Sequence, residues 1–368
     1  LGLIPAKQVF SGLSNSTVVL FAGMFVVGAA MFYTGLAQAL GEKVVHIFGT
    51  GENSLMLGLM LVGTALSSVL SNTGTCACLM PVALGICAAS KNPASRQLLP
   101  MAYACGWGGI ITLVGTPPNI IGSGALTAAG LPGFSFFEFA WIGIPLSVAG
   151  ILYMLLIGKY LLPKAELDAD QEIEQEIEAT THDKKKQMIS GMILLVCVIV
   201  MALDLKFISL EMTAIIGALV CVLTGCLTEK QAYSSIDWVT IFLFAGMMPV
   251  STAMDKTGAG KLIANWAVGL MGGEPTPLIV TIVLFSISCF LTQFMSNTAS
   301  AALLCPIGIA IAKQLNADPK AVVMAIAVAA SCAFATPVGT PPCTLVLGPG
   351  GYKFMDYVKC GTGLVLVC

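Results

Sequence analysis

The sequence predicts an all-α polytopic membrane protein built from two inverted-topology repeats, each with a re-entrant helical hairpin and a broken helix. Three observations support this fold class. The composition is 57% hydrophobic and only 10% charged, with a mean hydropathy of +0.92, whereas a soluble domain carries roughly 25% charged residues. The tripeptide Ser71-Asn72-Thr73 recurs as Ser296-Asn297-Thr298 in similarly apolar surroundings. The helix breaker Gly115-Thr116-Pro117-Pro118 recurs, in the same order, as Gly339-Thr340-Pro341-Pro342.

The composition also argues against several classes of protein. A net charge of −2 is too small to indicate a nucleic-acid partner, and two histidines in 368 residues leave little scope for a His-based metal site. The 13 cysteines include many scattered through apolar runs, where they are expected to act as small hydrophobes. Cys76-Ala77-Cys78 has no second His/Cys pair beside it, so we expect no metal site there and no organic cofactor.

The first repeat is predicted over residues 1–162. Its expected elements are a spanning helix at 17–40, an amphipathic connector at 41–53, a hairpin at 55–89, a broken helix at 98–129 and a further span at 137–157. The hairpin is expected because each limb has only about 15 apolar residues, too few to cross a bilayer that needs about 20. The helix at 98–129 is expected to break at Pro117 and Pro118, since proline removes an N–H and clashes with the preceding turn.

Residues 163–187 differ sharply from the rest of the chain. Acidic residues dominate the stretch and are followed by Lys184-Lys185-Lys186. This pattern predicts a solvated, charged linker between the repeats, and a regulatory contact is the alternative. When the linker is placed in the cytoplasm, most of the 17 Lys and Arg fall on the same side, as the positive-inside rule requires. The first hairpin then opens inward and the second outward.

The second repeat is predicted over residues 188–368. Its expected elements are spans at 188–203, 210–227 and 238–254, a connector at 255–272, a hairpin at 277–312, a broken helix at 320–346 and a truncated last helix. Gln8-Val9-Phe10-Ser11 resembles Gln231-Ala232-Tyr233-Ser234, which aligns the two repeats. Because two spans precede this element in the second half and none in the first, we expect the chain to lack at least two N-terminal helices and most of the final one.

The duplicated motifs predict binding chemistry. Non-helical backbone survives at membrane depth only against protein or in a wet cavity, so two tips and two breaks indicate one shared site. Their hydroxyl, amide and carbonyl oxygens suit sodium, and the helix N-termini after the breaks suit an anion. Apart from Lys320 at the first position of the second one, the spans that carry the breaks contain no Arg, Lys, Asp, Glu or His, which argues against a proton relay. A single Ser-Asn-Thr could be a simple helix cap, but ordered duplication of both motifs favours a site.

At these motifs the chain resembles the divalent anion/sodium symporter family, the sodium-coupled transporters of dicarboxylates, citrate and sulfate. The resemblance extends from the Gln8 element to Asp356. It implies a homodimer in a bacterial inner (plasma) membrane, with a scaffold domain and a transport domain that moves as an elevator. One departure is Cys343, where the first half has Asn119 and the resemblance implies Asn. If that Asn stabilises the break, the second break is expected to be looser.

The resemblance also implies which residues bind each ligand. The first of at least two sodium sites would use Ser67, Ser71, Asn72 and the carbonyl of Gly115. The second would use Thr292, Ser296, Asn297 and the carbonyl of Gly339. The dianion would contact Asn72, Thr73, Thr116, Asn297, Thr298, Thr340 and Pro341.

The leading hypothesis is therefore sodium-coupled import of a small dianion, foremost a C4-dicarboxylate such as succinate, malate or fumarate. A sulfate or citrate symporter and a dicarboxylate exchanger are the alternatives within the family. A channel or a polytopic membrane enzyme is the alternative from another class. The spans contain no HExxH motif, paired Asp or Ser/His dyad of an intramembrane protease, so we expect no enzyme.

Overall fold

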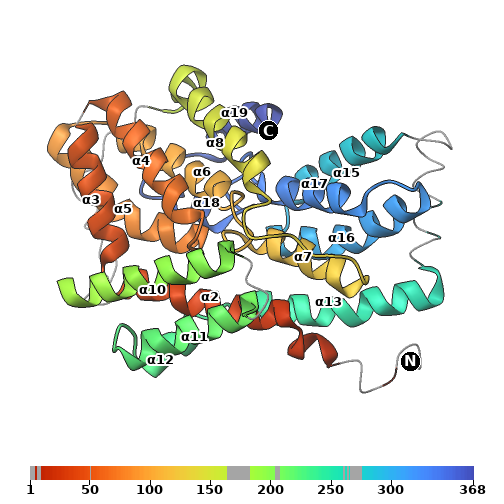
Figure 1. The fold of residues 1–368 in the computed structure, drawn as a ribbon. Helices are drawn as coiled ribbons and strands as arrows, with labels where there is room; N and C mark the ends of the chain where they lie inside the picture. Colours follow the sequence, from red (N-terminus) through yellow and green to blue (C-terminus); the bar gives the residue numbers. More distant parts are fainter. Residues whose placement is uncertain are drawn as a thin grey trace.

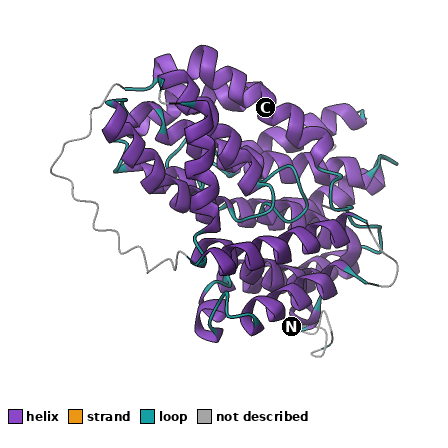
Figure 2. Cartoon of the chain, turned by 60° about the vertical axis from the view of Figure 1, so that its left-hand side comes forward, coloured by secondary structure: helices purple, strands orange, loops and turns teal. Residues whose placement is uncertain are grey.

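The structure is a computed structural model that describes residues 5, 10–49, 51–163, 183–203, 208–259, 262, 265 and 276–368. Throughout these residues the regular elements are helices, so the predicted all-α class is confirmed (Figure 2). The predicted linker at 163–187 lies mostly outside the described residues, as does much of the connector at 255–272. Three of the described helices are long and apolar enough to cross a membrane: Ser16–Tyr33, Ala140–Leu161 and Lys184–Ala202.

The first half contains both predicted devices, a helical hairpin and a broken helix. Its helices are η1 (Ser11–Ser14), α2 (Ser16–Tyr33), α3 (Leu36–Phe48), α4 (Glu52–Ser67), α5 (Asn72–Ser90), η2 (Ala94–Arg96), α6 (Leu98–Gly108), α7 (Pro117–Ala128), α8 (Ala140–Tyr153), η3 (Met154–Gly158) and α9 (Lys159–Leu161). The predicted span at 17–40 is interrupted between α2 and α3, because Gly35 adopts a φ of 73° that is left-handed and ends α2.

The second half repeats these devices after three further helices and a short α12. Its helices are α10 (Lys184–Ala202), α11 (Leu210–Leu223), α12 (Glu229–Ser234), α13 (Trp238–Thr257), α15 (Pro277–Leu291), α16 (Asn297–Gln314), α17 (Pro319–Ser331), α18 (Pro341–Leu347) and α19 (Phe354–Val367). The helix break between α17 and α18 matches the one between α6 and α7. In both cases two prolines occupy the first helical positions, where the missing N–H costs nothing.

The two halves interlock rather than lie side by side. Hairpin α4–α5 packs on α6, but α7, which follows the first break, crosses over to pack on α16 and α17 (Figure 1). In the same way, α18 follows the second break and packs on α5 and α6. The crossing brings both breaks and both hairpin tips to the centre. Helices α2, α10, α11 and α13 form a layer along the lower edge of this body in Figure 1.

The central helices are buried and the outer ones are apolar on their exposed faces. Every residue of α6 is buried, and Tyr103 on it donates from Oη to the carbonyl oxygen of Phe334, at 2.8 Å, in the second break. In contrast, Trp141 on α8 is 83% exposed, and Leu195 on α10 and Leu219 on α11 are also exposed. Large exposed apolar side chains along whole helices are what a lipid-facing surface requires.

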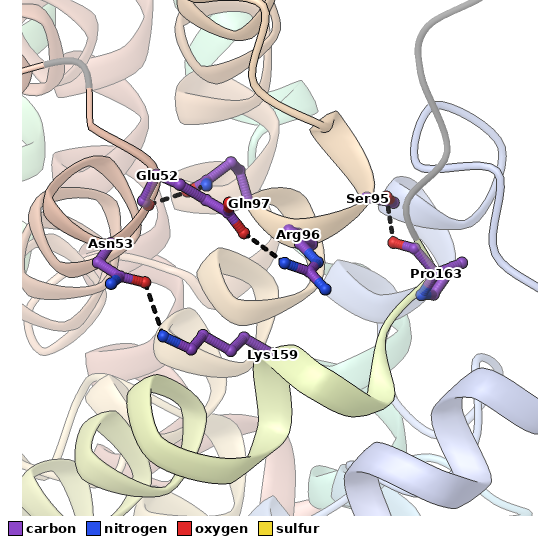
Figure 3. Close-up of polar contacts among 7 residues, drawn as sticks. All are labelled: Glu52, Asn53, Ser95, Arg96, Gln97, Lys159 and Pro163. Atoms are coloured by element: carbon purple, nitrogen blue, oxygen red, sulfur yellow. Dashed lines mark hydrogen bonds and ion pairs between the residues drawn. The ribbon is translucent and has the colours of Figure 1, made fainter.

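Polar contacts hold together the end of the first half that lies away from the breaks (Figure 3). Arg96 and Glu52 form an ion pair with 2.8 Å between Nη1 and Oε1. Lys159 donates from Nζ to Asn53 Oδ1 at 2.9 Å, and Ser95 donates from Oγ to the carbonyl of Pro163 at 2.6 Å. These contacts join the start of α4, η2, the start of α9 and the residue Pro163 that follows α9, and so anchor the base of the first hairpin.

Candidate functional site

The Ser-Asn-Thr motifs begin helices instead of forming the hairpin tips. Ser71 is the N-cap of α5, where its Oγ accepts from the backbone N–H of Gly74 at 3.2 Å. Ser296 caps α16 in the same way, accepting from Ala299 N at 3.2 Å. The tips therefore lie just before the motifs. The sequence analysis treated both Ser-Asn-Thr motifs as non-helical hairpin tips; this was wrong for their Asn and Thr residues, because a capping serine lets the next residue enter the helix. The part of Ser71 and Ser296 in cation binding stays a prediction.

A cluster of oxygen atoms surrounds the side-chain amide of Asn72. One atom of that amide lies 2.7 Å from Ser67 Oγ and 3.1 Å from the carbonyl oxygens of both Cys105 and Gly115. Ser67 is fully buried, and its Oγ is also 2.7 Å from the Cys105 carbonyl. The structure thus brings Ser67, Asn72 and Gly115 together, and it adds Cys105.

The second half builds a matching cluster around Asn297. One atom of its amide lies 2.8 Å from Thr292 Oγ1, 3.1 Å from the Ala330 carbonyl and 3.0 Å from the Gly339 carbonyl. Thr292 is fully buried and donates to the Ala330 carbonyl at 2.6 Å. Thr292, Asn297 and Gly339, which the family resemblance grouped together, therefore lie close to one another, again with one extra carbonyl.

The chemistry of both clusters suits a small hard cation. If the amide oxygen faces the cluster, it can accept from the hydroxyl of Ser67 or Thr292, but it also meets two carbonyl oxygens that cannot donate, so either the amide nitrogen turns in to donate or a cation lies among the oxygens. Hydroxyl, amide and carbonyl oxygens are the ligands that hard cations prefer. Ser67 ends α4 and Cys105 lies in the last turn of α6, while Thr292 and Ala330 lie at the ends of α15 and α17. Helix C-termini are partially negative, which further favours a cation.

A cavity of about 670 Å³ lies next to both clusters. It is lined by every residue that the sequence analysis assigned to the dianion: Asn72, Thr73, Thr116, Asn297, Thr298, Thr340 and Pro341. Asn72 and Asn297 therefore belong to a cluster and to the cavity wall at once. Thr116 is 1% exposed, and its hydroxyl has no hydrogen-bond partner among the described residues. The N-terminal ends of α5, α7 and α16 also border the cavity, and such ends favour anions.

The first break is held in shape by Asn119, which is fully buried on α7. Its Nδ2 donates to the carbonyl of Thr112 at 2.9 Å and lies near the carbonyls of Ile110, at 3.3 Å, and Gly109, at 3.4 Å. Thr112 in turn donates from Oγ1 to the carbonyl of Ser68 at the tip of the first hairpin. The side chains of the break thus replace the backbone bonds that the helix gives up there.

Sequence reasoning missed three groups at this site. The carbonyls of Cys105 and Ala330 carry no side-chain signal, although both lie close to the end of a helix that precedes a break. The third group is Asp237, a carboxylate on the cavity wall at the start of α13. Its Oδ1 accepts from Thr240 N at 3.1 Å, so it also caps α13. An Asp directly before an apolar run could have been recognised as a cap, but not as part of a cavity.

A central cavity between paired hairpins and broken helices, in a body with apolar outer helices, is the architecture of a solute transporter. The chain belongs to the citrate transporter family CitMHS, whose family model matches residues 1–300 and, in a second match, residues 198–368. The family and the relatives below are transporters rather than enzymes.

Individual relatives are similar over most of their length. An uncharacterized transporter of Haemophilus influenzae is 34% identical, across 100% of this chain and 82% of the relative. The sodium-dependent dicarboxylate transporter SdcS of Staphylococcus saprophyticus is 26% identical, across 98% of this chain and 75% of the relative. Among solved structures, the Alcanivorax borkumensis YdaH transporter, described as having an unusual topology, superposes with a TM-score of 0.71 at 15% identity, covering 99% of this chain and 87% of that one.

Proposed function

We propose that this protein is a sodium-coupled transporter that imports a small dianion, foremost a C4-dicarboxylate such as succinate, malate or fumarate. The observation that carries the proposal is the pair of oxygen clusters that share Asn72 and Asn297 with one cavity. Sodium-dependent dicarboxylate transporters among the relatives support the same ion and substrate class.

The arrangement couples cation and anion binding through shared residues. No Lys, Arg or His is among the described residues that line the cavity, so the protein offers no fixed positive side chain to a dianion there. Sodium would supply that positive charge when bound by Ser67, Asn72, Cys105 and Gly115, and by Thr292, Asn297, Ala330 and Gly339. The hydroxyls of Thr116 and Thr340 and the helix N-termini would then orient the anion's carboxylates.

We also propose how the molecule is organised for transport. Residues 1–162 and 188–368 would form inverted repeats joined by a cytoplasmic linker at 163–187, within a homodimer in a bacterial plasma membrane. The hairpins and broken helices would move as an elevator past the layer that contains α2 and α13. The interlocking of α7 with the second hairpin, and of α18 with the first, supports movement of both breaks as one body.

Uptake of labelled succinate into proteoliposomes tests the proposal. We expect uptake with a sodium gradient and none with choline, and competition by unlabelled malate and fumarate. Asn72→Ala and Asn297→Ala should each abolish coupled uptake, because each removes a group shared by a cluster and the cavity. Equal uptake in sodium and choline would rule out sodium coupling. Stronger competition by citrate or sulfate than by malate would assign the chain to one of those substrates.

A further inference from the structure

The two helix breaks have different side chains at corresponding positions. Asn119 braces the first break through the carbonyls described above, but Cys343 occupies its place after the second break. Cys343 is fully buried, and a thiol is too weak a donor to replace an amide. On this basis alone, the second break should be looser than the first.

Gln293, in the second hairpin, makes hydrogen bonds to the second break that Cys343 cannot make. It lies in the tip of the second hairpin with only 7% of its surface exposed. Its Oε1 accepts from Ala335 N at 2.9 Å, and its Nε2 donates to the carbonyl of Cys332 at 2.9 Å. The same nitrogen donates to the carbonyl of Cys289 at 2.9 Å. The amide thus joins the hairpin to the segment 332–335 at the second break, and it supplies hydrogen bonds that Cys343 cannot make.

The first hairpin has no such side chain at the corresponding position. Ser68 follows the cluster residue Ser67 just as Gln293 follows Thr292. Ser68 donates from Oγ to the Ala65 carbonyl at 2.7 Å, a contact inside its own hairpin. The first break is therefore held by a side chain of α7. The second is held by Gln293 from the hairpin and also by Thr344 on α18, which donates from Oγ1 to the carbonyl of Pro337 at 2.6 Å.

A short chain of contacts connects Gln293 to the second oxygen cluster. Thr336 donates from Oγ1 to the backbone carbonyl of Gln293 at 2.6 Å and accepts from Gly339 N at 3.1 Å. The carbonyl of Gly339 faces the amide of Asn297 at 3.0 Å. On the other side, Gln293 directly follows Thr292, whose hydroxyl is part of the same cluster. The side chain of Gln293 therefore spans the two segments whose spacing sets this cluster.

We propose that Gln293 is the positioning residue of the second cation site, where it replaces the brace that Asn119 provides in the first. The inference rests on the proposed sodium coupling. It makes the two breaks unequal: Asn119 holds the first break from α7 without a contact to the hairpin, whereas part of what holds the second break comes from hairpin α15–α16.

The test is the sodium dependence of succinate uptake by Gln293→Met, which keeps the length of the side chain but removes its hydrogen bonds. We expect the half-saturating sodium concentration to rise roughly tenfold, with a maximal rate close to wild type at saturating sodium. Adding Cys343→Asn to this variant should restore the sodium dependence to within about twofold. The matched control is Ser68→Ala, which should behave as wild type because only the backbone carbonyl of Ser68, which alanine keeps, contacts the first break.

Hydrogen exchange provides a readout that does not depend on transport. The segment 332–339 should exchange faster in Gln293→Met, while 109–116 is unchanged.

Wild-type sodium dependence or wild-type exchange in the variant would overturn the proposal, as would loss of uptake at every sodium concentration. If Cys343→Asn fails to rescue, the equivalence with Asn119 is overturned. If Gln293→Met does not fold, Gln293→Asn, one methylene shorter, is measured by the same criteria. A wild-type protein indifferent to sodium would instead refute the proposed function.

Discussion

Gly115 and Gly339 place their carbonyl oxygens in the two clusters, and each is a glycine because the chain passes very close to its neighbours. A Cβ on Gly115 would lie 2.5 Å from the carbonyl oxygen of Gly109 and 2.8 Å from that of Ser68. A Cβ on Gly339 would lie 2.9 Å from the carbonyl oxygen of Thr292. These contacts are with backbone, which cannot rotate away, so any side chain would push the break from the hairpin tip.

Gly115→Ala and Gly339→Ala should therefore each reduce sodium-dependent succinate uptake by more than about tenfold, since displacing a ligand by 1 Å is enough to impair a binding site. Uptake into proteoliposomes at fixed sodium measures this effect. The control is Gly85→Ala on α5, where an added Cβ meets nothing within 4 Å. Uptake near the wild-type rate in either variant would show that the breaks tolerate displacement and would weaken the assignment of the clusters.

Asp237 places a negative charge on the wall of a cavity proposed to hold a dianion. Asp237→Asn should lower the KM for succinate about threefold at low ionic strength, because a repulsive charge is removed. The difference should vanish in high choline chloride, where exposed charges are screened. The amide keeps an oxygen that can accept from Thr240 N, so α13 remains capped. An unchanged KM at low ionic strength would contradict the prediction, and Glu229→Gln on α12 is the control for a charge outside the cavity lining.

At the scale of elements, each broken helix depends on side chains that satisfy the backbone exposed by the break. Asn119 is the clearest case, because one buried amide serves carbonyls that would otherwise be left without donors. An unsatisfied buried carbonyl costs roughly 1–3 kcal/mol. The first break is therefore held in one conformation by hydrogen bonds.

Asn119→Leu should lower the melting temperature of the purified protein and reduce the stabilisation that sodium provides. The leucine is similar in size but leaves the carbonyl of Thr112 unpaired. Thermal unfolding in detergent with sodium or choline measures both effects, and Thr127→Val, near the exposed end of the same helix, is the control. A variant that sodium stabilises as strongly as wild type would mean that the first cluster does not depend on this brace.

At the scale of the whole molecule, the lower layer meets the hairpin body at the cavity. A Cβ on Gly28 of α2 would lie 3.8 Å from Cδ2 of Leu70, in the tip of the first hairpin, and both residues line the cavity. If the hairpin body moves past α2 during transport, this contact must break in every cycle.

A cross-link between Gly28→Cys and Leu70→Cys tests that movement. The cross-linked protein should lose succinate uptake, keep sodium-dependent succinate binding as measured by thermal stabilisation, and regain uptake after reduction. Each single-cysteine variant treated in the same way is the control for the native thiols. Full uptake by the cross-linked protein would contradict an elevator movement at this interface.

The sequence by itself determined the helical class and the duplication of the Ser-Asn-Thr and Gly-Thr-Pro-Pro motifs. An apolar chain in lipid must satisfy its backbone hydrogen bonds internally, which a helix does. Gly-Thr-Pro-Pro interrupts a helix, because proline lacks an N–H and clashes with the preceding turn. The residues that the family resemblance implied for the dianion all line one cavity. The serine caps were also within reach of sequence reasoning, since capping is a local property.

The tertiary structure alone decided which distant groups meet. The carbonyls of Cys105 and Ala330 could not be predicted, because every residue has a carbonyl and only packing selects one. The crossing of α7 and α18 between the halves, the approach of Asp237 to the cavity and the brace from Gln293 likewise depend on contacts between segments far apart in sequence. The sequence could not show how the second break is stabilised without an Asn at position 343. The hydrogen bonds are made by Gln293 of hairpin α15–α16, and only the fold brings Gln293 next to the break.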